Sequence, residues 1–120
     1  MQDHWCNRHR KHWLLSNTHV NCQILNHLKD HSIKIALGTS APTYNVEFVL
    51  DQLNLRKYFE VIVDGKDVQK GKPDPEVYLT CAKNLKVSNN QTIVFEDSIS
   101  GLISGKTAGS KIVGVATSHR

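Results

Sequence analysis

Two adjacent carboxylates, Glu96 and Asp97, directly follow a short apolar run that ends at Phe95. A β-branched and aromatic run of this length, bounded by polar residues, predicts a buried strand. In an open parallel α/β sheet, ligands bind just beyond the carboxyl ends of the strands. Hard oxygen donors at that place suit Mg²⁺, which takes one or two carboxylates together with phosphate oxygens and water. The alternative is an ordinary acidic start to the next helix, which the helix dipole favours.

Two further polar groups follow a predicted strand or lie in a loop between elements. The Thr39 hydroxyl, with the backbone N–H groups of Ser40 and Ala41 at a helix start, suits phosphate oxygens. Lys72 is followed by two prolines that stiffen the turn, so it can present a fixed positive charge to a phosphoryl group. Hydroxyl, ammonium and carboxylate groups are what phosphoryl transfer needs, because catalysis there is mostly positioning and charge neutralisation. Singly, each has a plainer explanation: a helix cap for the threonine and an ordinary loop for the lysine.

The elements that must position these groups alternate between helices and strands. Apolar spacing and cap residues predict helices over residues 20–30, 42–53, 74–85 and 98–108, and strands over residues 33–37, 59–63, 92–95 and 111–115. Asp74 and Ser98 are expected N-caps, and Gly109 is expected to end the last helix. Alternation of this kind predicts an α/β fold with a parallel sheet and flanking helices.

Composition narrows the class of protein. The chain has 120 residues, which fits one domain, and its net charge of +4 does not demand a nucleic-acid partner. Its three cysteines are an odd count at wide spacing, which favours a reducing interior over a disulfide framework. No run is long enough to span a membrane, so a cytoplasmic location is the expectation.

Residues 1–17 have no clear helical or strand period, and we predict that they form an irregular or disordered leader to a core domain at residues 18–120. Cys6, His9 and His12 are spaced three apart and could be read as a metal cluster. Zinc sites usually need a fourth ligand and a second, distant ligand pair, and none stands out. The leader is therefore the favoured interpretation.

Three segments together resemble a known family. Residues 36–40, 71–75 and 94–101, with Ala108-Gly109 and residues 113–115, are similar to the motifs of the haloacid dehalogenase-like (HAD) hydrolase superfamily, in its β-phosphoglucomutase-like branch. The resemblance covers about residues 20–120. It implies a Rossmann-like core and a Mg²⁺-dependent phosphatase or phosphomutase that acts on small phosphorylated metabolites, without nucleic-acid or membrane partners.

The resemblance also implies a role for each polar group. Thr39 and Lys72 would be the catalytic residues, Thr39 as the phosphate-binding hydroxyl and Lys72 as the charge-neutralising lysine. Ser40 and Ala41 would complete the phosphate site. Glu96 and Asp97 would hold the Mg²⁺ ion.

The chain departs from the family at the nucleophile. Family members attack with the first aspartate of an Asp-x-Asp motif that follows an N-terminal strand, and the second aspartate is the general acid/base. This chain contains no Asp-x-Asp, and it lacks the helical cap domain that normally precedes Thr39. Asp64 and Asp67 follow a predicted strand, but they are three residues apart rather than two. The resemblance therefore implies the C-terminal part of a larger enzyme, which we expect to be inactive alone.

Loss of the nucleophile strand would also remove the middle of the sheet and expose unpaired backbone groups. Three outcomes are open: residues 1–17 fill the gap, the two halves close up, or another chain associates through the unpaired edge. Two other functions remain as alternatives. A non-catalytic module that binds phosphate ligands or a partner chain would use the same residues. A receiver domain of two-component signalling is disfavoured, because receivers place their acidic residues before the threonine and lysine.

Overall fold

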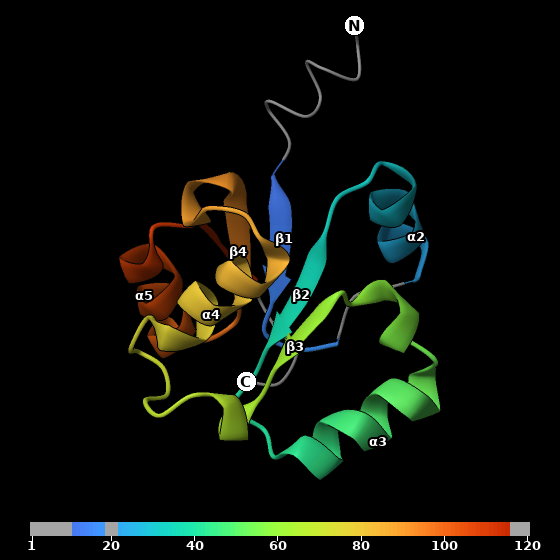
Figure 1. The fold of residues 1–120 in the computed structure, drawn as a ribbon, viewed down its shortest axis with the longest axis horizontal. Helices are drawn as coiled ribbons and strands as arrows, with labels where there is room; N and C mark the ends of the chain where they lie inside the picture. The colour runs from blue at the N-terminus through green and yellow to red at the C-terminus, as the bar shows by residue number, and fades with distance from the viewer. Residues whose placement is uncertain (1–10, 19–21, 116–120) are drawn as a thin grey trace, which may run out of the picture.

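One five-stranded parallel sheet runs through the protein in the order β3-β2-β1-β4-β5 (Figure 1). The structure is a computed structural model that describes residues 11–18 and 22–115. Its strands are β1 (His12–Leu15), β2 (Ile35–Gly38), β3 (Val61–Val63), β4 (Thr92–Glu96) and β5 (Lys111–Gly114). The prediction of a Rossmann-like parallel sheet is confirmed.

Four α-helices flank the sheet, as predicted. They are α2 (Cys22–Asp30), α3 (Thr43–Leu53), α4 (Glu76–Leu85) and α5 (Ile99–Ala108), with short 3-10 helices at Arg56–Tyr58, Gly65–Asp67 and Asn89–Gln91. None of the helices in the described part of the chain has the length and apolar character needed to cross a membrane.

The expected N-cap is present at α5 but not at α4. The Ser98 side chain accepts a hydrogen bond from the Gly101 N–H at the start of α5. The N-cap of α4 is Pro75 rather than the expected Asp74, whose carboxylate accepts a hydrogen bond from the Glu76 N–H 3.0 Å away. Gly109 ends α5 with φ 100°, a left-handed conformation that favours glycine. Local side-chain chemistry therefore fixes where the two helices nearest the carboxylates begin and end.

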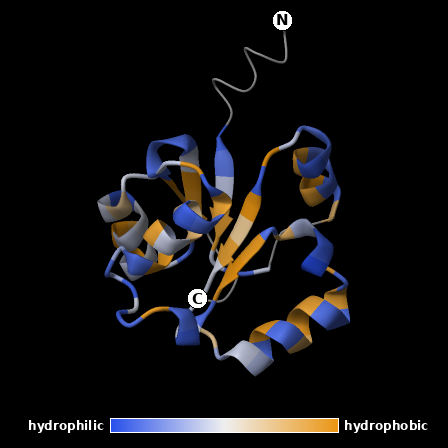
Figure 2. Cartoon of the chain, viewed as in Figure 1, coloured by the Kyte–Doolittle hydropathy of each residue, from blue (hydrophilic) through white to orange (hydrophobic). Residues whose placement is uncertain are grey.

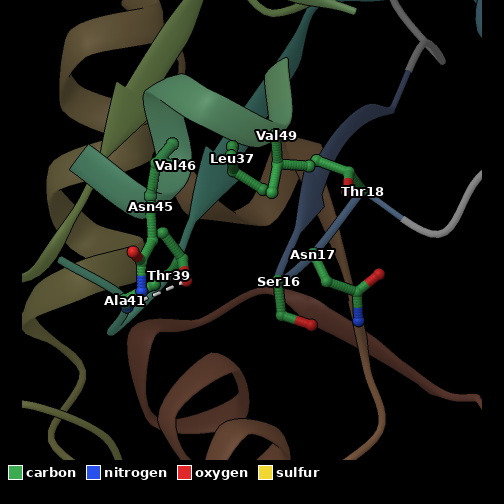
Figure 3. Close-up of a pocket in the computed structure, with 9 residues that line it drawn as sticks. All are labelled: Ser16, Asn17, Thr18, Leu37, Thr39, Ala41, Asn45, Val46 and Val49. Atoms are coloured by element: carbon green, nitrogen blue, oxygen red, sulfur yellow. Dashed lines mark hydrogen bonds between the residues drawn. The ribbon is translucent and has the colours of Figure 1, made fainter. Parts of the chain in front are cut away.

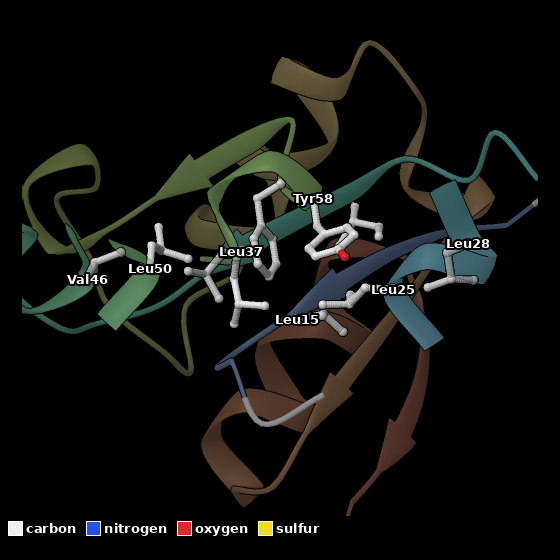
Figure 4. Packing of buried hydrophobic residues seen from close by; sticks show 10 residues of the cluster. Leu15, Leu25, Leu28, Leu37, Val46, Leu50 and Tyr58 are labelled. Carbon is white, nitrogen blue, oxygen red and sulfur yellow. The ribbon is translucent and has the colours of Figure 1, made fainter. Parts of the chain in front are cut away.

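The sheet separates two apolar layers, because successive side chains of a strand point to opposite faces. On one face, Leu15 and Leu37 pack with buried side chains of α2 and α3 (Figure 4). On the other face, Leu14 and Val94 pack with buried side chains that include those of α4. Apolar residues accordingly line the sheet and the inner sides of the helices, and polar residues face outward (Figure 2).

The prediction of an irregular leader is wrong for residues 12–15, which form β1 between β2 and β4. Leu14 is level with Ala36 on one side and with Val94 on the other. Trp13 stacks on Phe95 with ring centroids 4.1 Å apart. The strand is short and its sequence has only weak periodicity. It is stabilised by backbone hydrogen bonds along both edges and by the burial of its two leucines.

Of the three outcomes considered for the middle of the sheet, the first therefore holds. β1 fills the gap, and the central unpaired edge that was expected to promote association is absent from the described strands. Residues 1–10, which include Cys6 and His9 of the possible metal cluster, lie outside the described residues. His12 is buried in β1, where its Nδ1 atom accepts a hydrogen bond from the Lys34 N–H at 2.9 Å.

Candidate functional site

Lys72 lies at the carboxyl end of the sheet, where β2 and β4 end. The loop before α4 carries Lys72 inward, and its side chain is only 11 % exposed. Its Nζ atom donates to the Gly38 carbonyl oxygen at 3.2 Å and to the Glu96 Oε2 atom through a short ion pair. Gly38 immediately precedes Thr39, so the lysine is anchored to the backbone one residue before the threonine that was predicted to bind phosphate.

Glu96 is the buried anchor of this arrangement. It is 2 % exposed, and its Oε2 atom accepts hydrogen bonds from Lys72 and from the Tyr78 hydroxyl, the latter at 2.7 Å. Its Oε1 atom accepts from the Ser98 hydroxyl at 3.1 Å and from the Ser98 N–H at 3.3 Å. Both carboxylate oxygens therefore have partners within the protein.

Two opposing effects set the pKa of Glu96. Burial raises the pKa, because it disfavours the charged carboxylate. The hydrogen bonds from Lys72 and Tyr78 and the lysine charge outweigh burial, and the net effect is a lowered pKa. The pKa of Tyr78 is raised, by burial first and then by the neighbouring carboxylate, so its hydroxyl remains a proton donor. The network thus pairs an ionised carboxylate with a tyrosine hydroxyl that keeps its proton.

A glycine on α5 makes room for the carboxylate. A Cβ atom placed on Gly101 would lie 1.9 Å from Glu96 Cδ, far inside van der Waals contact. Gly101 belongs to the first turn of α5, whose N-cap is Ser98, a direct partner of Glu96. Gly101 therefore has a specific packing role, because it lets the helix lie directly against the buried carboxylate.

Thr39 lies at the other side of the lysine, in the turn from β2 to α3. Its hydroxyl accepts a hydrogen bond from the Ala41 N–H at 3.1 Å, and its own N–H donates to the Val63 carbonyl at 2.9 Å. The hydroxyl thus closes a local turn before α3 and does not cap the helix, whose N-cap is Pro42 without a side-chain hydrogen bond. The hydroxyl proton is still available to donate to an oxyanion.

An open pocket of about 150 Å³ joins this turn to the end of β1. Ser16, Asn17 and Thr18 form one wall, and Thr39 and Asn45 stand across from them (Figure 3). Apolar side chains of β2, of α3 and of the turn between them complete the lining, namely Leu37, Ala41, Val46 and Val49. The pocket offers hydroxyl and amide groups and no charged side chain.

Asp97 is exposed at the carboxyl end of β4, one residue past the buried Glu96. Within residues 11–18 and 22–115, no three histidine, cysteine or acidic side chains gather closely enough to hold a metal ion. The donors for a Mg²⁺ ion fit in part, because Asp97 is an accessible hard oxygen ligand. The Glu96 oxygens, in contrast, already accept hydrogen bonds from Lys72, Tyr78 and Ser98.

Asp64 and Asp67, the alternative acidic pair, close a local turn. The Asp64 side chain accepts from the Lys66 N–H, and the Asp67 side chain accepts from the Asp64 N–H, which is a capping box. This backbone hydrogen bond is the main cause of the lowered pKa of Asp67. Sequence reasoning missed Tyr78 as a site residue, because its spacing indicated only the buried face of a helix.

The parallel sheet with polar groups at its carboxyl end defines a Rossmann-like α/β protein. The family model of haloacid dehalogenase-like hydrolases matches residues 2–115, and the chain belongs to this family.

Individual relatives agree. The chain is 44% identical over 97 residues to a phosphorylated carbohydrates phosphatase from Thermotoga maritima, covering 80% of this chain and 45% of that protein. It is 36% identical over 94 residues to a bifunctional riboflavin kinase/FMN phosphatase from Arabidopsis thaliana, covering 78% and 25%. The structure of a β-phosphoglucomutase from Clostridium difficile superimposes with a TM-score of 0.74 at 32% identity, covering 79% and 42%. The chain spans less than half the length of each of these relatives.

Proposed function

We propose that this chain forms the phosphate-binding and charge-neutralising part of a HAD-type phosphatase or phosphomutase site. The observation that supports this best is the position of Lys72 between the buried Glu96 carboxylate and the Gly38 carbonyl, next to Thr39. A lysine that is fixed in this way keeps its charge at one place, where a phosphoryl oxygen can meet it without reorganisation.

Each group has one role in this proposal. Thr39 donates its hydroxyl proton to a phosphate oxygen, and the Ser40 N–H, in the turn before α3, faces the same anion, while the Ala41 N–H is held by the Thr39 hydroxyl. Lys72 supplies the positive charge. The ligand is a small phosphorylated metabolite, in keeping with relatives that are named for phosphorylated carbohydrates and FMN.

The family implies Mg²⁺, and the two predicted ligands differ in how well they fit it. Asp97 is accessible and would hold the ion, which would neutralise phosphate charge when bound. Glu96 would act chiefly through Lys72, which it fixes, because its own oxygens are already engaged. This assigns the two adjacent carboxylates to different tasks.

Turnover is not part of what we propose for this chain alone. It contains no Asp-x-Asp, and β1 is followed by the neutral residues Ser16, Asn17 and Thr18. None of these is a carboxylate that could form a phosphoenzyme in the manner the family resemblance implies. We therefore expect binding without hydrolysis, and this neutral strand end favours the non-catalytic alternative over an active phosphatase.

The test is calorimetric titration of the purified chain with inorganic phosphate, with Mg²⁺ and with EDTA. We expect Mg²⁺-dependent binding that weakens by about tenfold or more in Lys72→Met and Asp97→Asn, since each removes one charged contact. Lys70→Met, an exposed lysine in the same loop, is the matched control and should bind as the wild type does.

Hydrolysis of 4-nitrophenyl phosphate is measured on the same samples. Phosphate binding that is unaffected by Lys72→Met would contradict the proposed site. Hydrolysis that needs both Mg²⁺ and Asp97 would contradict the expected lack of turnover and would direct attention to Asp64 and Asp67 as nucleophiles.

A further inference from the structure

The surface of α2 carries two histidines that the candidate site does not use. His27 and His31 are four residues apart and therefore project from the same side of a helical turn. His31 lies one residue past the end of α2, but its backbone N–H still donates to the His27 carbonyl at 3.1 Å, so the helical spacing extends to it. Both residues are exposed, and their ring centroids are 4.2 Å apart. The same spacing on a helix places two imidazoles on zinc in known metal sites.

The contacts of His31 present the correct nitrogen to a metal. Its Nδ1 atom lies 2.8 Å from the His27 carbonyl oxygen. A carbonyl can only accept a hydrogen bond, so Nδ1 is the protonated nitrogen, and in the neutral ring the lone pair is on Nε2. Metal-binding histidines typically donate their second ring nitrogen to a carbonyl or carboxylate in this way, which fixes the tautomer and the ring orientation.

We propose that His27 and His31 form a surface site for a divalent transition-metal ion such as Zn²⁺, Ni²⁺ or Cu²⁺, with water completing the coordination. Imidazole suits these ions, whereas Mg²⁺ prefers oxygen ligands, so the site is chemically distinct from the one proposed at Asp97. Zinc–nitrogen bonds of about 2.0–2.1 Å hold two ligand atoms roughly 3 Å apart. The two ring centroids, 4.2 Å apart, lie close to this separation.

The charges around the pair are compatible with a cation. The intervening Lys29 is directed away, since its Nζ atom lies 3.4 Å from the Lys57 carbonyl and 6.0 Å from the centre of the Tyr58 ring. Asp30 adds a negative charge on the neighbouring residue. A purely structural role, in which the His31 ring caps the last turn of α2, accounts for its hydrogen bond but gives His27 no function.

The experiment is an NMR titration of the full chain with Cu²⁺ after treatment with EDTA, because the paramagnetic ion broadens only nearby signals. We expect substoichiometric Cu²⁺ to broaden the amide signals of residues 26–31. His27→Gln and His31→Gln should each weaken Cu²⁺ binding by about tenfold or more. With both histidines present, an ion bound by one imidazole is already close to the second, and each variant removes this advantage.

The matched control is the double variant H31Q/S32H, which keeps the number of histidines but breaks their spacing. Ser32 has φ 61°, a conformation that histidine tolerates better than most residues, so the turn should persist. This variant should lose the effect as well. Broadening at α2 that survives in any of the three variants would overturn the proposal, as would broadening confined to other parts of the chain.

Discussion

The ends of β4 and β1 are neighbours in the sheet but differ in how completely they are built. β4 ends in Glu96, a buried carboxylate with four hydrogen bonds from three side chains and one backbone N–H. β1 ends at Leu15, level with Phe95, and the residue that follows it, Ser16, is only half-buried and lines an open pocket. The end of β4 therefore carries a charge that is fixed in place, whereas the residues after β1 carry neutral polar groups.

The difference separates two tasks that a phosphoryl-transfer site normally combines. Charge neutralisation needs a rigid, desolvated cation, and Lys72 with its buried partner meets this requirement. Bond making needs a nucleophile, and the residues after β1 supply none with a carboxylate. Substitutions at the β4 end should therefore be costly and those at the β1 end mild.

The largest effect is expected for Lys72→Met. It leaves Glu96 buried without its cation, and breaking a buried ion pair costs about 3–5 kcal/mol. Urea unfolding should show this loss of free energy, together with loss of phosphate binding. Lys70→Met should change stability by less than about 0.5 kcal/mol, as a surface substitution does. Equal stability of the two variants would mean that the pair around Glu96 is not what holds this end of the sheet.

A smaller loss, of about 2 kcal/mol, is expected for Gly101→Ala, because the added methyl group overlaps the Glu96 carboxylate. Gly71→Ala is the matched control, since a Cβ atom there meets nothing within 4 Å. Thermal unfolding of both variants measures the difference. If the two substitutions were equally tolerated, α5 would not be packed against the carboxylate as the structure has it.

Much of the β4 end could be predicted from local sequence signals. The apolar run before Glu96, the Ser98 cap and the glycine after α5 each act over a few residues, and all three appear where they were expected. Contacts across the fold could not be predicted in this way. The hydrogen bond from Tyr78 to Glu96 depends on how α4 packs on the sheet, which periodicity does not specify.

β1 is a second element that local sequence signals do not predict. Residues 12–15 have no clear strand period, because a central strand of a parallel sheet is buried on both faces and need not alternate. Its identity as a strand comes from its partners β2 and β4, which lie far away in the sequence. Pairing of this kind is decided by tertiary structure rather than by local propensity.

Tyr78→Phe removes one hydrogen bond to a charged group and should cost about 1.5 kcal/mol. The ring and its packing stay in place, so the loss reports on the hydroxyl alone. Tyr44→Phe, at a side chain that is 74 % exposed, is the control and should be neutral. A difference of less than about 0.5 kcal/mol between the two variants in urea would show that Lys72 and Ser98 hold Glu96 without the tyrosine.

The lowered pKa of Glu96 predicts a pH dependence of smaller size. Its stabilising contribution is complete above the unfolded-state pKa of about 4.3 and is lost as the pH falls through the lower pKa of the folded state. Stability in EDTA should therefore fall below about pH 4.5, and less steeply in Glu96→Gln than in the wild type. Parallel curves for the two proteins would assign the acid sensitivity to other carboxylates, such as Asp67, whose pKa is also lowered.

The smallest effect is expected at the β1 end. Ser16→Ala removes a half-buried hydroxyl from the wall of an open pocket, where water can replace it, and should change stability by less than about 0.5 kcal/mol. Phosphate binding should stay within about twofold of the wild type, because Lys72 and Thr39 supply the anion contacts in the proposed site. Calorimetry of Ser16→Ala beside Thr39→Val tests this, since the threonine variant should bind clearly more weakly. A large loss of phosphate affinity in Ser16→Ala would mean that the ends of β1 and β4 bind the phosphate jointly. The two strand ends would then differ in charge but share one function.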